Sequence, residues 1–237
     1  NSNKKEALKI VKENASQKDL QNPKLFSNEA EEKLLGYSVN FDNDTLGISM
    51  TLKRLPADLL EIKRKPSKRE VLQLTMSIFD PLGLFEFIIS KAKLIYHDCI
   101  NEKLDWHEII NDSLFAQWKK LIKWLNEINH VKIPRAYSLN MGNVKSFQLI
   151  AFTDASFDIH CCCIYIRMLD SDNNQVDVKL IGAKSRIISK KRSRSIPEME
   201  LEGLDQGIKY IEKVVKVHEI KFDEIYVLID STCVLEW

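Results

Sequence analysis

The sequence predicts a mixed chain, part α+β and part α/β, in which a small hairpin and a helical region precede a mixed sheet of order β-β-β-α-β. From residue 68 to about 129, apolar residues recur at three- and four-residue steps, which is typical of helices. After Lys145 the pattern changes to nearly continuous apolar runs, as in the central strands of a sheet. The last run follows a long amphipathic segment, so its strand can return parallel to the first.

Composition limits the possible classes of protein. The 237 residues suffice for one large domain or two small ones. Lys and Arg number 35 against 34 Asp and Glu, so the net charge is +1 and any nucleic-acid surface must be local. A hydrophobic fraction of 44% excludes a wholly disordered chain. The 7 glycines and 6 prolines are too few for collagen, flexible linkers or a turn-dense β-sandwich.

Targeting and redox features are equally plain in the sequence. No apolar run approaches the roughly 20 residues that span a bilayer, and the N-terminus has no signal-peptide core, so no membrane association is expected. The chain starts without Met and ends on Trp237, so both ends are expected to be cuts through a longer polypeptide. Its five cysteines, three of them consecutive at 161–163, favour an intracellular reducing compartment, with cytoplasm and nucleus both open.

The first part of the chain is expected to be polar and partly helical. Residues 4–14 suit a helix, followed by a loop around Pro23. Residues 33–40 and 45–50 are predicted as two strands, joined by a turn at 42–44 into a hairpin. Residues 53–69 hold seven Lys or Arg and two acids, which is consistent with a solvated linker or with a nucleic-acid surface.

The middle and the end of the chain are more regular. The helical pattern from residue 68 is broken by a turn at 80–83, and a further helix is predicted at 111–127. Strands are predicted at 147–153, 160–169, 176–183 and 224–229, with a long helix at 197–219 before the last of them. Within the second strand, alternation places Cys161 and Cys163 on one face, where small buried side chains are the default.

Two carboxylates follow strands that are expected to be parallel neighbours. Asp154 ends the first strand and Asp230 ends the fourth, so both should emerge at the same edge of the sheet. The intervening helix offers three glutamates. At 100° per residue, Glu200 lies about 60° from the centre of the apolar face, Glu198 about 100° and Glu202 about 140°. That face is taken as Leu201, Leu204, Ile208, Ile211 and Val215, so Glu200 is predicted to join the two aspartates.

Three facing carboxylates are costly unless cations neutralise them. Hard oxygen ligands suit Mg²⁺ or Mn²⁺, and two such ions roughly 3.5–4 Å apart would support phosphodiester hydrolysis. The alternative interpretation stays open at this point: aspartates after strands are common turn formers and helix caps, and a glutamate on a helix is usually solvated.

Longer motifs resemble a known family. Residues 152–156, 199–204 and 229–235 resemble the first three acidic motifs of the ribonuclease H fold. The polyprotein of BEL/Pao-type retrotransposons, in the block also known as the Pao retrotransposon peptidase, is resembled by further motifs: residues 67–72, 77–84, 92–93, 104–106 and 133–135 upstream of the acidic motifs, and 183–186 between the first two of them. The most specific of these motifs is Ile-Phe-Asp-Pro-Leu-Gly at 78–83.

The resemblance implies a layout and a function. Residues 1–62 correspond to the distal end of the reverse transcriptase palm, 63–145 to a helical thumb or connection region, and 146–237 to a ribonuclease H-like domain incomplete at its C-terminus. The full-length parent would be a hydrolase that cuts the RNA strand of RNA/DNA hybrids. Asp154, Glu200 and Asp230 would be its catalytic and metal-binding residues, with two Mg²⁺ or Mn²⁺ ions as cofactors. Its partners would be the hybrid and the remainder of the Pol polyprotein.

The resemblance also implies departures. The Tyr-x-Asp-Asp motif of the polymerase is absent, so this fragment is not expected to polymerise DNA. The fourth acidic residue is expected beyond Trp237, which leaves the activity of the fragment itself open. Glu198 stands where the family has a basic or apolar residue, and it is expected to perturb the site by like-charge repulsion.

Two other functions are compatible with parts of the pattern. One is a non-catalytic nucleic-acid-binding remnant or domesticated copy of the element. The other is an aspartic peptidase, which needs Asp-Thr/Ser-Gly so that two aspartates can share a proton. Residues 44–47 and 230–232 do not match that motif.

A basic run precedes the helix that contains Glu200. Residues 184–194 hold six basic side chains and no acid, in a segment expected to connect the third strand to that helix. It would be either a solvated loop or an edge that contacts the phosphates of the hybrid. The nucleic-acid-binding residues predicted on this basis are Lys184, Arg186, Lys190, Lys191, Arg192 and Arg194.

Overall fold

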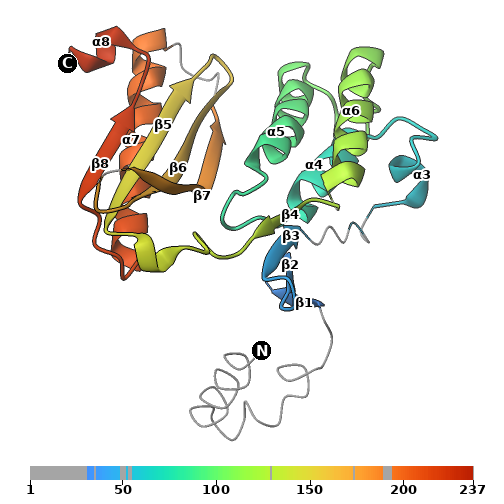
Figure 1. Ribbon diagram of the computed structural model, residues 1–237. Helices are drawn as coiled ribbons and strands as arrows, with labels where there is room; N and C mark the ends of the chain where they lie inside the picture. Colours follow the sequence, from blue (N-terminus) through green and yellow to red (C-terminus); the bar gives the residue numbers. More distant parts are fainter. Residues whose placement is uncertain are drawn as a thin grey trace, which may run out of the picture.

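The computed structural model of the chain describes residues 31–34, 36–48, 52, 55–128, 130–172, 174–188 and 194–236. These residues form two sheets of four strands each, and a group of helices follows the third strand of the first sheet along the chain (Figure 1). The helix expected at 4–14 and the loop around Pro23 lie outside the described residues.

The first sheet has the order β1-β2-β3-β4, and all its pairs are antiparallel. Its strands are β1 (Glu31–Leu34), β2 (Tyr37–Asn40), β3 (Thr45–Ile48) and β4 (Lys132–Pro134). The single strand expected at 33–40 is wrong, because the chain turns at Gly36, whose φ of 89° is accessible to glycine at little cost. Since β4 pairs with β3, the sheet combines the hairpin with chain from beyond the helices. The division of the chain at residues 62 and 145 stays a prediction.

The helical region has its own core. Its helices are α3 (Ala57–Leu60), α4 (Lys68–Ser77), α5 (Glu86–Asn101) and α6 (Asp112–Ile128). A capping box between Ser67 and Glu70 starts α4. The helix predicted at 111–127 corresponds to α6, whose apolar residues are buried in this core, with Trp118 fully enclosed. The prediction of helices on either side of a turn at 80–83 is confirmed.

The basic stretch at 53–69 is not a free linker where the structure describes it. Leu59 is fully buried in the helical core. Arg64 binds the carboxylates of Asp58 and Glu70, each at 2.7 Å, and Lys65 lies 2.9 Å from Asp112. Arg64 and Lys65 therefore form ion pairs within the helical region, and these pairs hold the segment against the helices.

The second sheet has the order β7-β6-β5-β8. Its strands are β5 (Ser146–Ala155), β6 (Ile159–Leu169), β7 (Gln175–Ile187) and β8 (Glu224–Leu228). The helix α7 (Ile196–Val217) packs on β5 and β6, and a short α8 (Thr232–Leu235) follows β8 (Figure 1). β8 pairs with β5 in parallel, which confirms the predicted crossover, while the other pairs are antiparallel.

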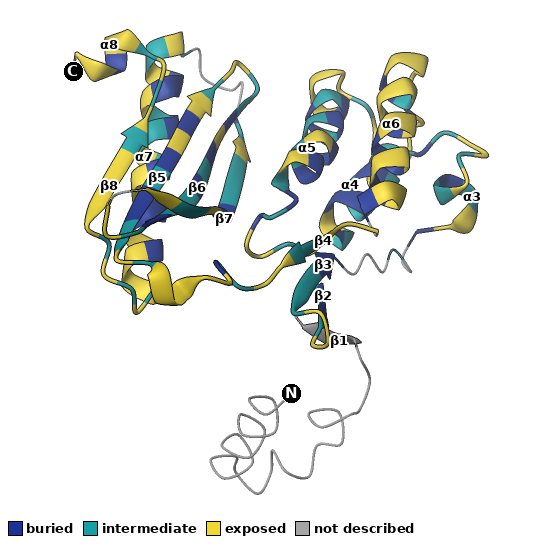
Figure 2. Cartoon of the chain, viewed as in Figure 1, coloured by how far each residue is buried: buried dark blue, intermediate teal, exposed yellow. Residues whose placement is uncertain are grey.

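The buried face of α7 differs from the predicted one. Leu201, Ile208 and Val215 are 43%, 43% and 39% exposed. The buried positions are Met199, Glu200, Gly203, Gly207, Tyr210, Ile211 and Val214, and Figure 2 shows the same alternation along the helix. Glycines bring the helix backbone close to β5: a Cβ at position 207 would lie 2.4 Å from Cγ2 of Thr153. The hydrophobicity of the residues does not mark such positions, so the helical projection made from the sequence was centred on the wrong stripe of α7.

The motif at 78–83 forms a junction between both sheets and the helices. The Asp80 carboxylate accepts hydrogen bonds from the amides of Gly83, Leu84 and Phe85 at 3.0, 3.1 and 2.7 Å, and the Tyr37 hydroxyl also donates to it. Burial, followed by Asp80, raises the pKa of Tyr37.

The same junction reaches the second sheet. The Leu82 carbonyl accepts from the amide of Ala183 at 3.0 Å and from the hydroxyl of Tyr210 at 3.3 Å. Nearby, Lys93 on α5 donates to the carbonyl of Ser185 at 3.2 Å. The most specific motif of the sequence thus has a structural role, since it holds the first sheet and α5 against β7.

The expectation that Cys161 and Cys163 lie on a buried face is wrong, because Cys162 is the buried one of the three, whereas Cys161 is exposed and Cys163 is half-buried. All five cysteines lie within the described residues and are free thiols. Among the residues that the structure describes, no helix has the length and apolar content to cross a bilayer.

Candidate metal centre

The three predicted carboxylates converge at one edge of the second sheet. Each of Asp154, Glu200 and Asp230 offers an oxygen, and these three oxygens lie within 4.8 Å of one another. The strand register explains the two aspartates, because Phe152 pairs with Leu228 and each aspartate lies two residues further along its chain. Parallel pairing therefore brings both to the same level, as the sequence predicted.

The start of α7 places the third carboxylate. Ser195 caps the helix and accepts from the amide of Glu198, whose own carboxylate accepts from the amide of Ser195 at 2.7 Å. This capping box fixes where the helix begins, and it orients Glu200 toward the strand ends. Glu198, predicted to perturb the centre, instead caps the helix at an exposed position. Glu202 faces away from the centre and binds Arg194.

Glu200 is electrostatically unusual. Glu200 is only 7% exposed, and its Oε2 is buried without a hydrogen-bond partner. Burial is the main cause that raises the pKa of Glu200, followed by the charges of Asp154 and Asp230, while a backbone hydrogen bond at Ala155 lowers it. The centre is therefore stabilised by any positive charge that reaches it, either a proton or a cation.

The donor set fits a divalent cation. Carboxylate oxygens are the ligands that Mg²⁺ and Mn²⁺ prefer, and the unpartnered Oε2 of Glu200 provides a buried lone pair for one such ion.

The aspartic-peptidase alternative does not fit the positions of its two aspartates. Asp44 lies in the turn after β2, where its carboxylate binds Arg135 at 2.6 Å, whereas Asp230 lies beside Glu200 at the second sheet. The two aspartates of the peptidase alternative are thus held in different sheets.

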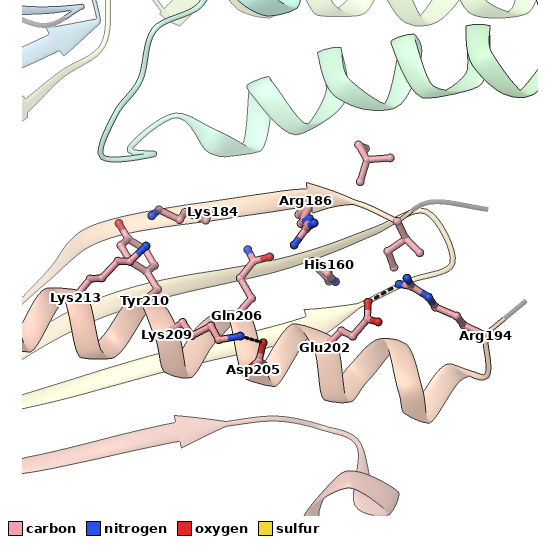
Figure 3. A pocket seen from close by; sticks show the side chains of 12 residues that line it. His160, Lys184, Arg186, Arg194, Glu202, Asp205, Gln206, Lys209, Tyr210 and Lys213 are labelled. Atoms are coloured by element: carbon pink, nitrogen blue, oxygen red, sulfur yellow. Dashed lines mark hydrogen bonds and ion pairs between the residues drawn. The ribbon is translucent and has the colours of Figure 1, made fainter. Parts of the chain in front are cut away.

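The predicted basic loop is wrong in part. Lys184 and Arg186 belong to β7, which extends beyond its predicted end at 183. Arg194 lies just before α7, and Lys190, Lys191 and Arg192 lie outside the described residues. The described basic residues line a cavity that sequence reasoning missed, together with His160 and two lysines of α7 (Figure 3). The i, i+4 spacing of Lys209 and Lys213 on the helix was the signal available for it.

The fold and the centre define the class of protein. Three antiparallel strands, a crossover helix and a parallel fourth strand, with acids at the ends of the first and fourth strands and on the helix, make a ribonuclease H-like domain. The family model described as the Pao retrotransposon-like RNaseH-like domain matches residues 67–231, which is more than half of the chain. The chain belongs to this family, and the sequence-based recognition of a retrotransposon Pol region is confirmed.

Other comparisons add little beyond this. No curated protein matches the chain. Among solved structures, the chain is similar to that described as the foamy viral protease-reverse transcriptase dRH in complex with ds DNA, with a TM-score of 0.47 and 15% identity. The match covers 88% of this chain, which spans 32% of the viral one.

Proposed function

We propose that this chain is the part of a retrotransposon Pol polyprotein that hydrolyses the RNA strand of RNA/DNA hybrids with divalent metal ions. The observation that supports this most directly is the convergence of Asp154, Glu200 and Asp230 from three separate elements, with oxygens within 4.8 Å. Membership of the Pao retrotransposon-like RNaseH-like domain family supports the polyprotein context. In this proposal the hybrid and the remainder of Pol are the partners.

The chain's own residues have distinct tasks in this function. Two bound Mg²⁺ or Mn²⁺ ions would supply an activated water and stabilise the leaving oxygen of the cut phosphodiester. Asp154 and Asp230 are exposed at the sheet edge, where they can offer oxygens to ions that a substrate also reaches. Glu200 holds the inner side of the centre, because α7 buries it and the backbone at Ala155 orients it. The positive charge of the ions offsets the repulsion among the three carboxylates.

The experiment is cleavage of a labelled RNA/DNA hybrid by the chain with Mg²⁺, Mn²⁺ or EDTA. We expect cuts in the RNA strand with either metal and none with EDTA or in duplex DNA. Asp154→Asn and Glu200→Gln should lower the rate by about 10²-fold or more, as is common when a group acts only in the transition state. Glu212→Gln is the matched control, since Glu212 is an exposed glutamate on the same helix.

The outcomes separate the candidate functions. Metal-dependent cleavage that persists in Glu200→Gln would refute the proposed metal centre. Binding without cleavage, both by this chain and by a chain extended past Trp237 to the expected fourth acidic residue, would favour the non-catalytic binding remnant instead.

A further inference from the structure

Leu82 of the junction lies between the first sheet and α7, and its backbone contacts both. Its amide donates to the hydroxyl of Tyr37 on β2 at 3.1 Å. Its carbonyl accepts from the hydroxyl of Tyr210 on α7 at 3.3 Å and from the amide of Ala183 on β7 at 3.0 Å. A single residue therefore connects the sheet at the start of the chain with the helix that contains Glu200.

Asp80 holds Leu82 in this position. Its carboxylate accepts from the amides of residues 83, 84 and 85 at 3.0, 3.1 and 2.7 Å, and also from the hydroxyl of Tyr37. Hydrogen bonds to an ionised carboxylate are stronger than neutral ones, and Tyr37 is only 5% exposed, so water has little access to the hydroxyl at their centre. The loop is thus fixed to β2 before it reaches α7.

Strand β7 is shaped to receive the loop and the helix at one point. The register of β7 with β6 shifts at Ile181, which makes a bulge beside Gly182. A Cβ at Gly182 would overlap both the hydroxyl oxygen of Tyr210 and the carbonyl oxygen of Leu82. Bulges bend a strand locally and are frequent next to active sites. The bulge and the glycine together therefore provide the space in which the loop, the strand and α7 meet.

The packing of α7 explains why this contact matters for the metal centre. Gly203 and Gly207 let the helix approach the sheet closely, but they have no side chains that could interlock with it and fix the helix along its axis. Tyr210 lies on the same buried side of α7, and Figure 3 shows its side chain extending toward β7 beside Lys184. It follows Glu200 by ten residues, or about 15 Å at the rise of an α-helix. Because a helix is stiff over this length, a displacement at Tyr210 also displaces Glu200.

We propose that Tyr37, Leu82 and Tyr210 form a bridge through which the first sheet positions α7, and that Tyr210 is a positioning residue of the metal centre. The inference rests on the proposed function for the role of the metal ions. Tyr210 contacts neither the ions nor the substrate, and it acts through the placement of Glu200. The affinity of the centre for divalent ions therefore depends on a hydroxyl group that belongs to the other sheet.

The first test follows the placement of α7 without metal. Tyr210→Phe and Tyr37→Phe each remove one hydroxyl and keep the ring. In EDTA, the nuclear Overhauser effect between the α protons of Gly207 and the methyl protons of Thr153 reports how closely α7 lies to β5. This signal should weaken in both variants. Wild-type intensity in both of them would overturn the proposal.

A matched control removes a tyrosine hydroxyl that does not connect separate elements. The hydroxyl of Tyr226 donates at 2.7 Å to Glu224, which lies on the same strand, β8. Tyr226→Phe therefore loses a comparable hydrogen bond in the same domain, and its nuclear Overhauser effect between α7 and β5 should equal that of the wild type. An equal weakening in this control would show a general loosening of the domain and would also overturn the proposal.

The second test measures Mg²⁺ binding by calorimetry in a double-mutant cycle. Each of Tyr37→Phe and Tyr210→Phe should weaken Mg²⁺ binding by about threefold or more, because metal ligands tolerate little displacement. The double variant should bind no more weakly than the weaker single variant, since both hydroxyls act through Leu82. In cleavage assays kcat should fall while the KM for the hybrid stays unchanged. Additive losses of Mg²⁺ affinity would overturn the bridge.

The outcomes distinguish this inference from the proposed function. If the wild type binds no Mg²⁺ and cuts no hybrid, the proposed function fails, and the metal-free signal between Gly207 and Thr153 decides the bridge by itself. If the wild type binds Mg²⁺ and cuts the hybrid, but Tyr37→Phe and Tyr210→Phe match it in both measurements, the bridge alone is refuted.

Discussion

Replacing Gly83 with alanine should separate the junction at 78–83 from β7. The φ of Gly83 is 73°, and a Cβ there would lie 1.8 Å from the carbonyl oxygen of Ala183 and 2.7 Å from its carbonyl carbon. The left-handed conformation costs a residue with a side chain about 1–2 kcal/mol. Overlap with backbone that belongs to a strand adds about 1–3 kcal/mol. We therefore expect Gly83→Ala to destabilise the chain by about 2–5 kcal/mol.

The assay combines urea denaturation with hydrogen exchange. The amide of Ala183 donates to the carbonyl of Leu82, so its exchange reports directly on the docked junction. Gly142→Ala is the matched control, because a Cβ at Gly142 would meet nothing within 4 Å, and its effect should stay within about 0.5 kcal/mol. If Gly83→Ala is as stable as Gly142→Ala and the Ala183 amide exchanges at the wild-type rate, the reasoning about this contact is refuted.

Three further predictions concern the metal centre. In Gly207→Ala, the added Cβ would lie 2.4 Å from Cγ2 of Thr153, so α7 should move away from β5. Hybrid cleavage should fall at least tenfold, while circular dichroism should show that the helix is retained. Unchanged cleavage would contradict this prediction. Mg²⁺ at ten times its Kd should stabilise the wild type by about 1.4 kcal/mol in thermal melts, and Asp154→Asn should abolish this gain; a wild type indifferent to Mg²⁺ would count against the centre. Because the folded state raises the pKa of Glu200 above 4.5, stability should fall as pH rises through the interval above that value. Glu200→Gln should therefore raise the melting temperature at pH 7 without metal but not below pH 4, and equal shifts at both pH values would refute the assignment.

Periodicity was sufficient for the order of the elements in the second half of the chain. Strands with continuous apolar runs and a long amphipathic helix are local patterns, and the right-handed crossover then leaves the fourth strand parallel to the first. From that order alone, Asp154 and Asp230 are predicted to lie at one edge, and the register of β5 with β8 places them at one level.

Glu200 does lie beside the two aspartates, as predicted, although the apolar face from which it was chosen is not the buried face of α7. Glu200 lies between the exposed stripe containing Leu201 and Ile208 and the buried stripe containing Gly203 and Gly207, so either centre favours it. Hydropathy ranks leucine above glycine. The packing against β5 selects glycine, because only a position without Cβ lets the helix backbone approach the strand.

The sequence by itself determined the class of fold, the identity of the three carboxylates and the family, since each follows from residues close together in the chain or from spacings along it. Only the tertiary structure decided the pairing of β4 with β3, the junction through Asp80, and the cavity around His160. These features join residues that are far apart in sequence, and each depends on backbone hydrogen bonds, close approach at glycine or the burial of a polar ring. Such interactions leave no periodic trace in the chain, because they arise only when separate elements pack together.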